Sequence, residues 1–343
     1  MKAVVYYGPG DIRVEDLLTP KIRREEILIK VKASGLCPTD VRIAKYGSPK
    51  VKAPVILGHE FSGVVEEAME IEDLRKGDRV TLPADIYCGK CNMCRRGLEN
   101  HCENALSFGY NLNGSHAEYI LIPREAVIRN LIYRIPPSMS FEEAVFTEPL
   151  ACCINSIEAL GVTPGTSIAI IGDGPMGLLH VQLARIYGAD EIVLIGLHDW
   201  KLDLGAKLGA STLVNAKKKD PIKEVLNLTA GKGVDKVVLT AGLPESLTQA
   251  LKFISKKGII NIFAGVQNSL VNLDTNAIHY NEIFLTGTKD YTYRMYEKAL
   301  RMIAERRVKV KELISHKYRI DEIEKAITTW ENKEKSLKII LYD

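Results

Sequence analysis

The chain is predicted to be an α/β protein with two parts, a barrel-like β domain and a doubly wound parallel sheet. Up to about residue 150, short apolar β runs are broken by glycine and proline, and beyond it apolar strands alternate with helical segments. The 343 residues are enough for two hydrophobic cores. We expect a first domain over 1–150, a second over 151–289, and a return of 290–343 to the first domain.

Apolar and β-branched residues between turn residues indicate the strands of the first part. These strands are expected at 2–7, 26–33, 63–66, 79–82 and 117–122. After residue 290 the chain offers one helix at 296–305 and an apolar strand at 337–341. Because these two segments no longer alternate regularly, we assign them to the first domain.

The second part alternates between strands and helices in the way that βαβ units require. Strands are expected at 167–171 and 191–195, and helices at 176–187 and 202–208. The alternation continues through 236–240, 247–255, 258–263 and 282–286. Strands that are apolar throughout indicate a parallel sheet buried on both faces.

The composition is that of an ordinary globular protein, with 46% apolar and 26% charged residues. A net charge of +3 gives no reason to expect nucleic acid or a membrane surface as a partner. No stretch approaches the roughly 20 apolar residues of a membrane span, and acidic residues lie where a signal peptide needs an apolar core. We expect a cytoplasmic protein, in which clustered cysteines bind metal instead of forming disulfides.

Four of the seven cysteines, Cys88, Cys91, Cys94 and Cys102, form a compact quartet spaced C-x2-C-x2-C-x7-C. Four thiolates saturate a zinc ion. A bacterial iron–sulfur run would place its fourth cysteine three residues after the third, followed by proline, whereas here Glu103 follows a seven-residue gap. We expect a structural zinc that braces a lobe; the alternative is four cysteines without a metal.

A second group of residues predicts a metal site with an open position. Cys37 and His59, with one carboxylate, would leave a coordination position for water or substrate. Glu60 and Glu148 compete for the role of third ligand, and Thr39 is placed to take up a proton beside Cys37. A lone cysteine and histidine are more often core residues, but these neighbours favour a catalytic zinc.

The strand at 167–171 leads into a G-x-G-x-x-G turn and then into an apolar helix, which is the setting of a dinucleotide site. The first glycine makes the turn, the second lets the pyrophosphate approach, and the third lets the helix pack on the strand. The backbone N–H groups at the helix N-terminus would bind the phosphates. The residues expected to hold the cofactor here are Gly172, Gly174, Pro175, Met176 and Gly177.

The acidic residue that selects NAD is missing from the expected position. It normally ends the second strand, about 20 residues after the glycine turn, where this chain has Gly196. Its absence makes room for a 2′-phosphate, which His198 and Lys201 would bind. Alternatively, both are solvated loop residues and Asp199 binds the ribose. We expect NADP or NAD, with NADP favoured.

The motifs follow one another in an order that resembles the zinc-dependent medium-chain dehydrogenases, over essentially the whole chain. They are C-x-T-D at 37–40, G-H-E at 58–60, the cysteine quartet, E-P-L at 148–150 and the glycine turn. The chain looks most like the polyol branch typified by sorbitol dehydrogenase, which carries Glu-Pro-Leu where classical alcohol dehydrogenases have a third cysteine ligand. The resemblance implies a GroES-like catalytic domain, a Rossmann domain, a cleft between them, and homodimers or homotetramers.

The resemblance also implies the reversible oxidation of a secondary alcohol in a polyol or sugar derivative. Zinc would lower the pKa of the hydroxyl, Thr39 would take up its proton, and hydride would pass to the nicotinamide. Arg42 replaces a relay histidine that many relatives carry, so the proton path beyond Thr39 is unassigned. The alternatives are a threonine-type amino-alcohol dehydrogenase, a zinc-independent reductase, and a zinc-stabilised nucleotide-binding protein without catalysis.

Secondary expectations concern residues close to these motifs. Asp40 is a candidate to hold a ligand of the metal in place. Cys152 and Cys153 are expected to be packed core residues. The residues considered for lining the substrate site are Tyr46, Phe108, Tyr110 and Asn111.

Overall fold

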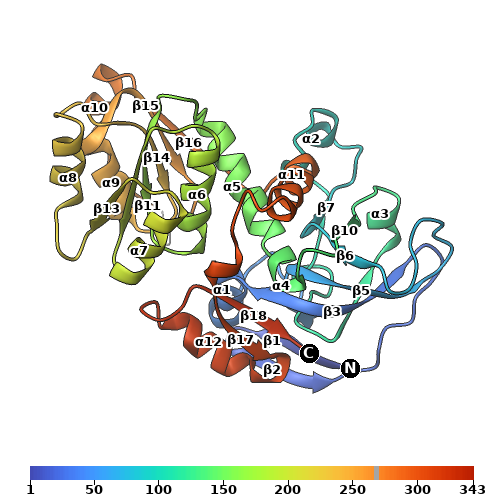
Figure 1. The fold of residues 1–343 in the computed structure, drawn as a ribbon. Coiled ribbons are helices and arrows are strands. Elements are labelled where there is room, and N and C mark those ends of the chain that lie inside the picture. Colours follow the sequence, from blue (N-terminus) through green and yellow to red (C-terminus); the bar gives the residue numbers. More distant parts are fainter. Residues whose placement is uncertain (266–269) are drawn as a thin grey trace. The chain divides into compact units, whose positions relative to one another are not determined.

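The computed structural model describes residues 1–265 and 270–343, which form two compact units (Figure 1). Unit 1 comprises Met1–Pro149, Tyr291–Arg306 and Val310–Asp343, and unit 2 comprises Leu150–Asp290 and Arg307–Lys309. The chain therefore completes unit 1 only after it has passed through unit 2. The predicted functional roles of 1–150, 151–289 and 290–343 stay proposals.

Unit 2 contains a six-stranded parallel sheet in the order β13-β12-β11-β14-β15-β16. Its strands are β11 (Ser167–Ile171), β12 (Glu191–Gly196), β13 (Thr212–Asn215), β14 (Val234–Leu239), β15 (Ile254–Ile262) and β16 (Phe284–Gly287). Its helices are α6 (Pro175–Ile186), α7 (Asp199–Leu208), α8 (Pro221–Leu228), α9 (Pro244–Phe253) and α10 (Thr275–Tyr280). The strand order reverses at β11, so the doubly wound parallel sheet is as predicted.

The two faces of this sheet are covered by different helices, because neighbouring residues of a strand point to opposite sides. Val193 packs in a core cluster with residues of α8, α9 and α10. The next residue, Leu194, instead packs beside Gly205 of α7 and Leu178 of α6. Helices on both faces keep water from the strands and explain their apolar sequences.

Unit 1 is mainly antiparallel β structure. A seven-stranded sheet has the order β10-β6-β5-β3-β18-β17, with β9 also paired to β3. Smaller sheets are β2-β1-β4 and β7-β8. The strands are β1 (Lys2–Gly8), β2 (Asp11–Asp16), β3 (Ile27–Leu36), β4 (Val55–Ile56), β5 (Glu60–Ala68), β6 (Arg79–Thr81), β7 (Asp85–Ile86), β8 (Leu106–Ser107), β9 (Tyr119–Ile122), β10 (Tyr133–Arg134), β17 (Ile314–Arg319) and β18 (Lys338–Tyr342).

Several helices of the chain are absent from the sequence-based prediction. They are α8 and α10 of unit 2, and also α1 (Pro38–Tyr46), α2 (Asn92–Arg95), α3 (Arg124–Val127), α4 (Phe141–Ala144), α5 (Thr147–Leu160), which joins the two units, and α12 (Ile323–Glu331). The predicted helix at 296–305 is present as α11 (Tyr293–Ala304). The turns η1 (Glu99–His101), η2 (Lys311–Leu313) and η3 (Ile320–Glu322) complete the helical segments. α1 was missed because it is short and begins one residue after a strand, although Pro38 at its first position is a signal for the start of a helix.

Three distant segments of unit 1 meet at the end of β3. Gly35 of β3 pairs with Glu60 of β5 on one side and with Ile340 of β18 on the other. Cys37 follows β3 directly and is the N-cap residue of α1. This register brings β3, β5 and β18 together around the predicted catalytic residues.

In the described ranges, no helix combines the length and apolar character that crossing a membrane requires.

Candidate functional site

Two groups of side chains in the described part of the chain have the composition and spacing of metal sites. In each, three or more Cys, His or acidic residues place their ligand atoms within 4.8 Å of one another. One is the quartet of Cys88, Cys91, Cys94 and Cys102, and the other is Cys37, His59 and Glu60. Both groups belong to unit 1.

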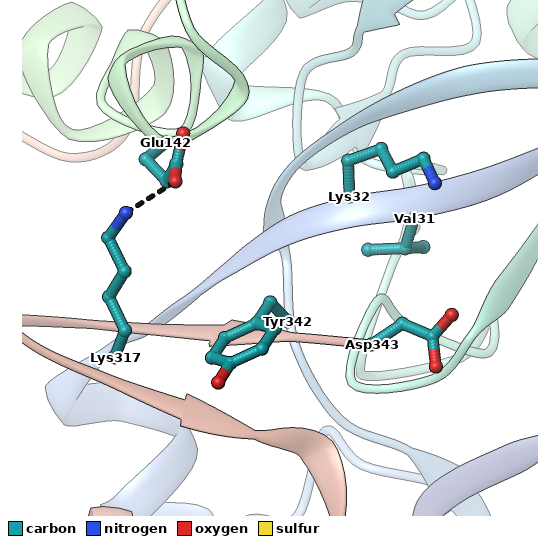
Figure 2. Close-up of a pocket in the computed structure, with 6 residues that line it drawn as sticks. All are labelled: Val31, Lys32, Glu142, Lys317, Tyr342 and Asp343. Carbon is teal, nitrogen blue, oxygen red and sulfur yellow. Dashed lines mark hydrogen bonds and ion pairs between the residues drawn. The ribbon is translucent and has the colours of Figure 1, made fainter.

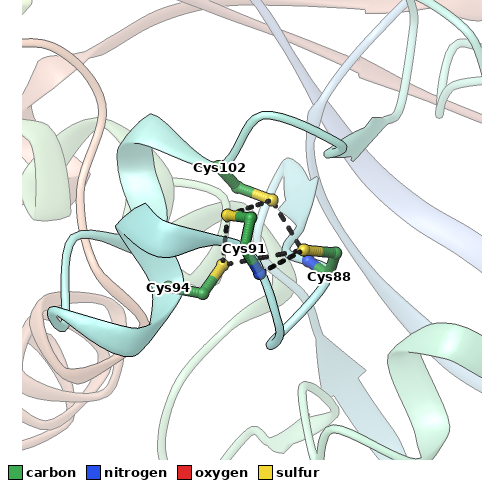
Figure 3. Close-up of side chains that lie close together, drawn as sticks. All are labelled: Cys88, Cys91, Cys94 and Cys102. Atoms are coloured by element: carbon green, nitrogen blue, oxygen red, sulfur yellow. Dashed lines mark hydrogen bonds between the residues drawn. The ribbon is translucent and has the colours of Figure 1, made fainter.

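The four cysteines of the quartet converge from one loop that contains α2 and η1 (Figure 3). Sulfur–sulfur distances are 3.5 Å for Cys91–Cys94 and 4.0 Å for both Cys88–Cys94 and Cys91–Cys102. Thiolates about 2.3 Å from a tetrahedral zinc would lie about 3.8 Å apart. All four are free thiols, and backbone hydrogen bonds lower the pKa of Cys88 to about 6. The quartet therefore fits a structural zinc.

The second group lies where β3 ends and β5 begins. His59 and Glu60 are buried, and Cys37 is half-buried beside them. The position of the Glu60 carboxylate requires glycine at residue 35, because a Cβ atom there would lie 2.2 Å from Oε2 of Glu60. Burial raises the pKa of the Cys37 thiol, although the adjacent His59 acts in the opposite direction. A sulfur, an imidazole and a carboxylate in this arrangement suit a zinc ion with an open position.

Asp40 connects this group to a second buried histidine. Its Oδ1 lies 3.1 Å from Nδ1 of His59, and its Oδ2 lies 3.4 Å from Nε2 of His116. Oδ2 also accepts a 3.0 Å hydrogen bond from the backbone N–H of Cys37. Burial alone would raise the pKa of Asp40, but the two histidines hold it well below its usual range. Because Nδ1 of His59 faces this carboxylate, Nε2 is left for a metal.

Glu60 has a second charged neighbour, Lys338 of β18, whose ammonium pairs with Oε2 of Glu60 in the protein interior. Burial would lower the pKa of Lys338, but the negative charges of Glu60 and Cys37 raise it. Sequence analysis missed both Lys338 and His116. The signal for Lys338 was a single lysine at the start of an otherwise apolar strand, whereas nothing local marked His116.

The other residues predicted for the catalytic site do not belong to the group of Cys37, His59 and Glu60. Glu148 is buried in the first turn of α5 and is not a member of the Cys37, His59 and Glu60 group. Thr39 is partly exposed in the first turn of α1, and Arg42 is exposed. The ring of Tyr110 lies 6.5 Å from that of His59, and burial raises the pKa of Tyr110 to about 12.

The remaining aromatic candidates are not equivalent. Phe108 is fully buried against Phe61 and belongs to the core of unit 1, so it does not line a substrate site. Tyr46 is largely exposed. The hydroxyl of Tyr110 keeps its proton at neutral pH and can donate a hydrogen bond, which makes Tyr110 the aromatic residue best suited to contact a substrate.

The glycine turn has the geometry that its sequence predicts. Gly172 has φ +124°, and a Cβ atom there would lie 2.4 Å from Oγ1 of Thr240. A Cβ atom on Gly177 would lie 1.8 Å from the carbonyl oxygen of Gly172, so the third glycine lets α6 pack against the turn. A Cβ atom on Gly174 would meet no other atom within 4 Å. Space beside Gly174 and the N-terminus of α6, which begins at Pro175, suit a pyrophosphate.

Gly196 is required by packing. A Cβ atom there would lie 2.5 Å from Cβ of Asp173 and 2.7 Å from its Oδ2. That oxygen accepts hydrogen bonds of 2.8 Å from the backbone N–H groups of Leu197 and His198, and lies 2.9 Å from Nδ1 of His198. A carboxylate from within the glycine motif thus occupies the space of a side chain at 196. Sequence analysis assigned Asp173 no role.

The two residues proposed to bind a 2′-phosphate have protein neighbours. His198 contacts Asp173, as described above. Lys201 is 3% exposed, and its Nζ lies 5.4 Å from the ring centre of Trp200. Burial lowers the pKa of Lys201, although the charge of Asp173 opposes this. The assignment of His198 and Lys201 to a 2′-phosphate stays a proposal.

A hollow of about 330 Å³ lies elsewhere on unit 1 (Figure 2). It is lined by Val31, Lys32, Glu142, Lys317, Tyr342 and Asp343. Lys317 and Glu142 form an ion pair of 2.5 Å at its edge. Neither metal-binding group lines this hollow, so it is not the candidate catalytic site.

Comparison with known proteins gives matches over the whole chain. A family described as the alcohol dehydrogenase GroES-like domain matches residues 23–133, and one described as zinc-binding dehydrogenase matches 175–305. Sorbitol dehydrogenase of Bacillus subtilis is 30% identical over 348 residues, covering 100% of this chain and 97% of its own. L-Threonine 3-dehydrogenase of Bacillus licheniformis is 32% identical over 332 residues, covering 95% and 94%.

A solved structure shares the same fold. It is described as a zinc-binding dehydrogenase from Sinorhizobium meliloti bound to NADP, with a TM-score of 0.91 and 29% identity. The match covers 100% of this chain and 99% of that one. The predicted fold class, a GroES-like domain with a Rossmann domain, is confirmed.

The packing of Gly196 predicts the outcome of a substitution. Gly196→Ala should destabilise unit 2 by about 1–3 kcal/mol, because the new methyl group displaces Asp173 and its hydrogen bonds. Dinucleotide binding should weaken at the same time. Thermal unfolding and titration with NADPH measure the two effects. Gly8→Ala, whose Cβ would meet nothing within 4 Å, is the control.

A double variant tests whether overlap with the side chain of Asp173 causes the loss of stability in Gly196→Ala. Adding Asp173→Ala should remove most of the penalty of Gly196→Ala, because the two side chains no longer compete for one space. A penalty that is the same with and without Asp173 would show that the overlap is not its cause.

Proposed function

Because the chain belongs to the zinc-dependent medium-chain dehydrogenase family, in the polyol branch that its motifs predict, we propose that it transfers hydride between NAD(P) and a secondary alcohol of a polyol or sugar derivative. Membership of the family makes the chain an NAD(P)-dependent dehydrogenase with zinc. The grouping of Cys37, His59 and Glu60 beside Asp40 is the observation that carries the proposal.

The proposed reaction converts the alcohol and NAD(P)⁺ into a ketone, NAD(P)H and a proton. Cys37, His59 and one carboxylate would hold a zinc ion, which would supply a Lewis acid that lowers the pKa of the alcohol. Asp40 holds His59 so that Nε2 of His59 faces the proposed metal position. Thr39, partly exposed, takes up the hydroxyl proton and passes it towards solvent. Tyr110 donates a hydrogen bond to a substrate oxygen.

For the cofactor we propose NADP over NAD. The absence of an acidic residue at position 196 supports this choice, as does the zinc-binding dehydrogenase that is similar to this chain and binds NADP. The carboxylate of Asp173 opposes it, because a negative charge close to residue 196 disfavours a 2′-phosphate. Dissociation constants for NADPH and NADH decide the question, and tighter binding of NADH would reject the proposal.

A threonine-type amino-alcohol dehydrogenase is the second candidate, since L-threonine 3-dehydrogenase is as similar to this chain as sorbitol dehydrogenase. A panel of threonine, sorbitol, xylitol, inositols and sugar phosphates distinguishes the two. A higher kcat/KM for threonine than for every polyol would overturn the polyol assignment. The zinc-independent reductase predicts instead that turnover survives removal of the catalytic metal.

Cys37→Ala should lower kcat/KM by about 10²–10³-fold or more, because the variant loses a ligand of the proposed zinc and with it the stabilisation of negative charge on the substrate oxygen. NADPH binding should persist, since the glycine turn belongs to unit 2. Steady-state kinetics and NADPH fluorescence measure these effects. Cys152→Ser is the matched control and should keep both zinc content and turnover. Near-normal alcohol oxidation by Cys37→Ala would contradict the assignment.

For the third metal ligand we propose Glu60, with Glu148 as the alternative. Glu60→Gln should therefore lower the zinc content from two ions to one, and Glu148→Gln should not. Glu60→Gln also leaves Lys338 as an unpaired buried cation, which costs about 3–5 kcal/mol of unfolding free energy. Metal analysis after dialysis and thermal unfolding measure the two effects.

The variant Glu60→Gln/Lys338→Met separates metal binding from stability. It removes both charges, so it should recover stability without recovering the second zinc. Loss of zinc in Glu148→Gln and retention in Glu60→Gln would assign the ligand to Glu148.

We propose a homodimer or homotetramer that assembles in the cytoplasm. β16 is an edge strand of the sheet in unit 2, and within the described residues it pairs only with β15. It exposes Phe284 and Leu285, and the nearby Tyr280 is also exposed. Apolar edge strands of this kind are suited to pairing with another chain.

Phe284→Lys should convert the oligomer to a smaller species, because a charge is placed on the apolar edge. Light scattering coupled to size-exclusion chromatography measures the mass. Leu228→Lys, at another exposed apolar position on α8, should leave the mass unchanged. A monomeric wild-type protein would reject the proposed assembly.

A further inference from the structure

His116 is held against the backbone that precedes His59. Its backbone N–H donates to the carbonyl of Leu57 at 2.9 Å, and the N–H of Ser115 donates to that of Gly58 at 3.0 Å. The imidazole covers Gly58, where a Cβ atom would lie 2.5 Å from Nδ1 of His116. Gly58 has φ +96° and leads directly into His59. The position of His116 is therefore tied to that of the proposed metal ligand.

Both ring nitrogens of His116 face polar groups. Nε2 lies 3.4 Å from Oδ2 of Asp40, and Nδ1 lies 2.9 Å from Oγ of Ser34. Ser34 in turn shares a 2.7 Å hydrogen bond with Ser115. Asp40 thus meets a different histidine with each oxygen, His59 at Oδ1 and His116 at Oδ2. These two contacts have ion-pair distances and are not aligned hydrogen bonds.

A serine, a histidine and an aspartate in contact have the composition of a hydrolytic triad, but this arrangement cannot meet a substrate. Ser34 and Ser115 are fully buried, and His116 is 1% exposed. Simple packing does not explain the histidine either, because burying its nitrogens costs free energy unless they have polar partners. The arrangement instead limits how the carboxylate of Asp40 can turn.

We propose that His116 is a positioning residue of the metal site. It fixes Oδ2 of Asp40, so that Oδ1 of the same carboxylate stays against Nδ1 of His59. Nε2 of His59 then stays directed at the proposed metal position. The proposal rests on the proposed function, since it requires a metal at Cys37 and His59. Partners that orient a metal ligand contribute about 10–100-fold to metal affinity.

Two substitutions of His116 separate its nitrogens. His116→Asn keeps an amide near the place of Nδ1, within reach of Ser34, and loses the contact with Asp40. His116→Gln places its amide near the place of Nε2 and keeps that contact. The amides are chemically alike, so the pair tests which nitrogen matters. Ser34→Ala, which removes the partner of Nδ1, is the further control.

The measurement is chelator competition on the full protein loaded with zinc, followed by cobalt substitution of the weaker site. His116→Asn should bind metal at the Cys37 site about 10–100-fold more weakly and shift the visible cobalt bands. His116→Gln and Ser34→Ala should bind metal with close to the affinity of the wild type, because the contact with Asp40 is kept. Zinc at the cysteine quartet should be unchanged in every variant and serves as the internal reference.

The outcomes distinguish this proposal from the proposed function. Equal metal affinity and equal cobalt spectra in His116→Asn and wild type would overturn the positioning role. Equal weakening in the Asn, Gln and Ser34→Ala variants would overturn it too, because general loss of packing would then be the cause. A wild-type protein that binds metal only at the quartet would instead reject the proposed function. If His116→Asn does not fold, the test uses His116→Gln alone. Metal affinity at the Cys37 site that falls in His116→Gln as far as in Cys37→Ala would overturn the proposal, and metal affinity like that of the wild type would support it.

Discussion

The approach of β3 to β5 and β18 is the constraint on which the catalytic end of the protein depends. Gly35 pairs with both neighbouring strands, and a Cβ atom there would overlap the carboxylate of Glu60, which occupies the space beside it. This register determines where Cys37 emerges from the sheet and which residues face it. A shift of one residue would turn each side chain to the opposite face of the strand. The geometry of the candidate site therefore depends on strand register and on the absence of a side chain at residue 35.

Buried charges in unit 1 are tolerated because they are compensated in pairs. Asp40 lies between His59 and His116, and Glu60 pairs with Lys338. Removing one partner of such a pair leaves an uncompensated charge in the interior, at a cost of about 3–5 kcal/mol. These five residues come from four separate segments of the sequence, since only His59 and Glu60 are adjacent. The site is thus a folding constraint as well as a candidate catalytic centre.

The glycine turn that we propose as the nucleotide site in unit 2 depends on a similar exclusion of space. Gly172 and Gly177 allow the turn and the helix to approach, and Asp173 takes the volume that a side chain at 196 would need. The carboxylate then organises the backbone after β12 through Leu197 and His198. A missing acidic residue, interpreted from sequence as a change of cofactor, has a steric cause in the neighbouring loop.

The sequence by itself determined the elements whose signals are local. The alternation of strands and helices predicted the parallel sheet, and the cysteine spacing predicted a group whose sulfurs do converge. Conversely, only tertiary structure placed Lys338 beside Glu60, His116 beside Asp40, and Asp173 against Gly196. These contacts arise between strands and loops far apart in the chain, so no spacing within one segment encodes them. Local periodicity reports the pattern of each element, whereas strand register and side-chain volume decide which residues meet.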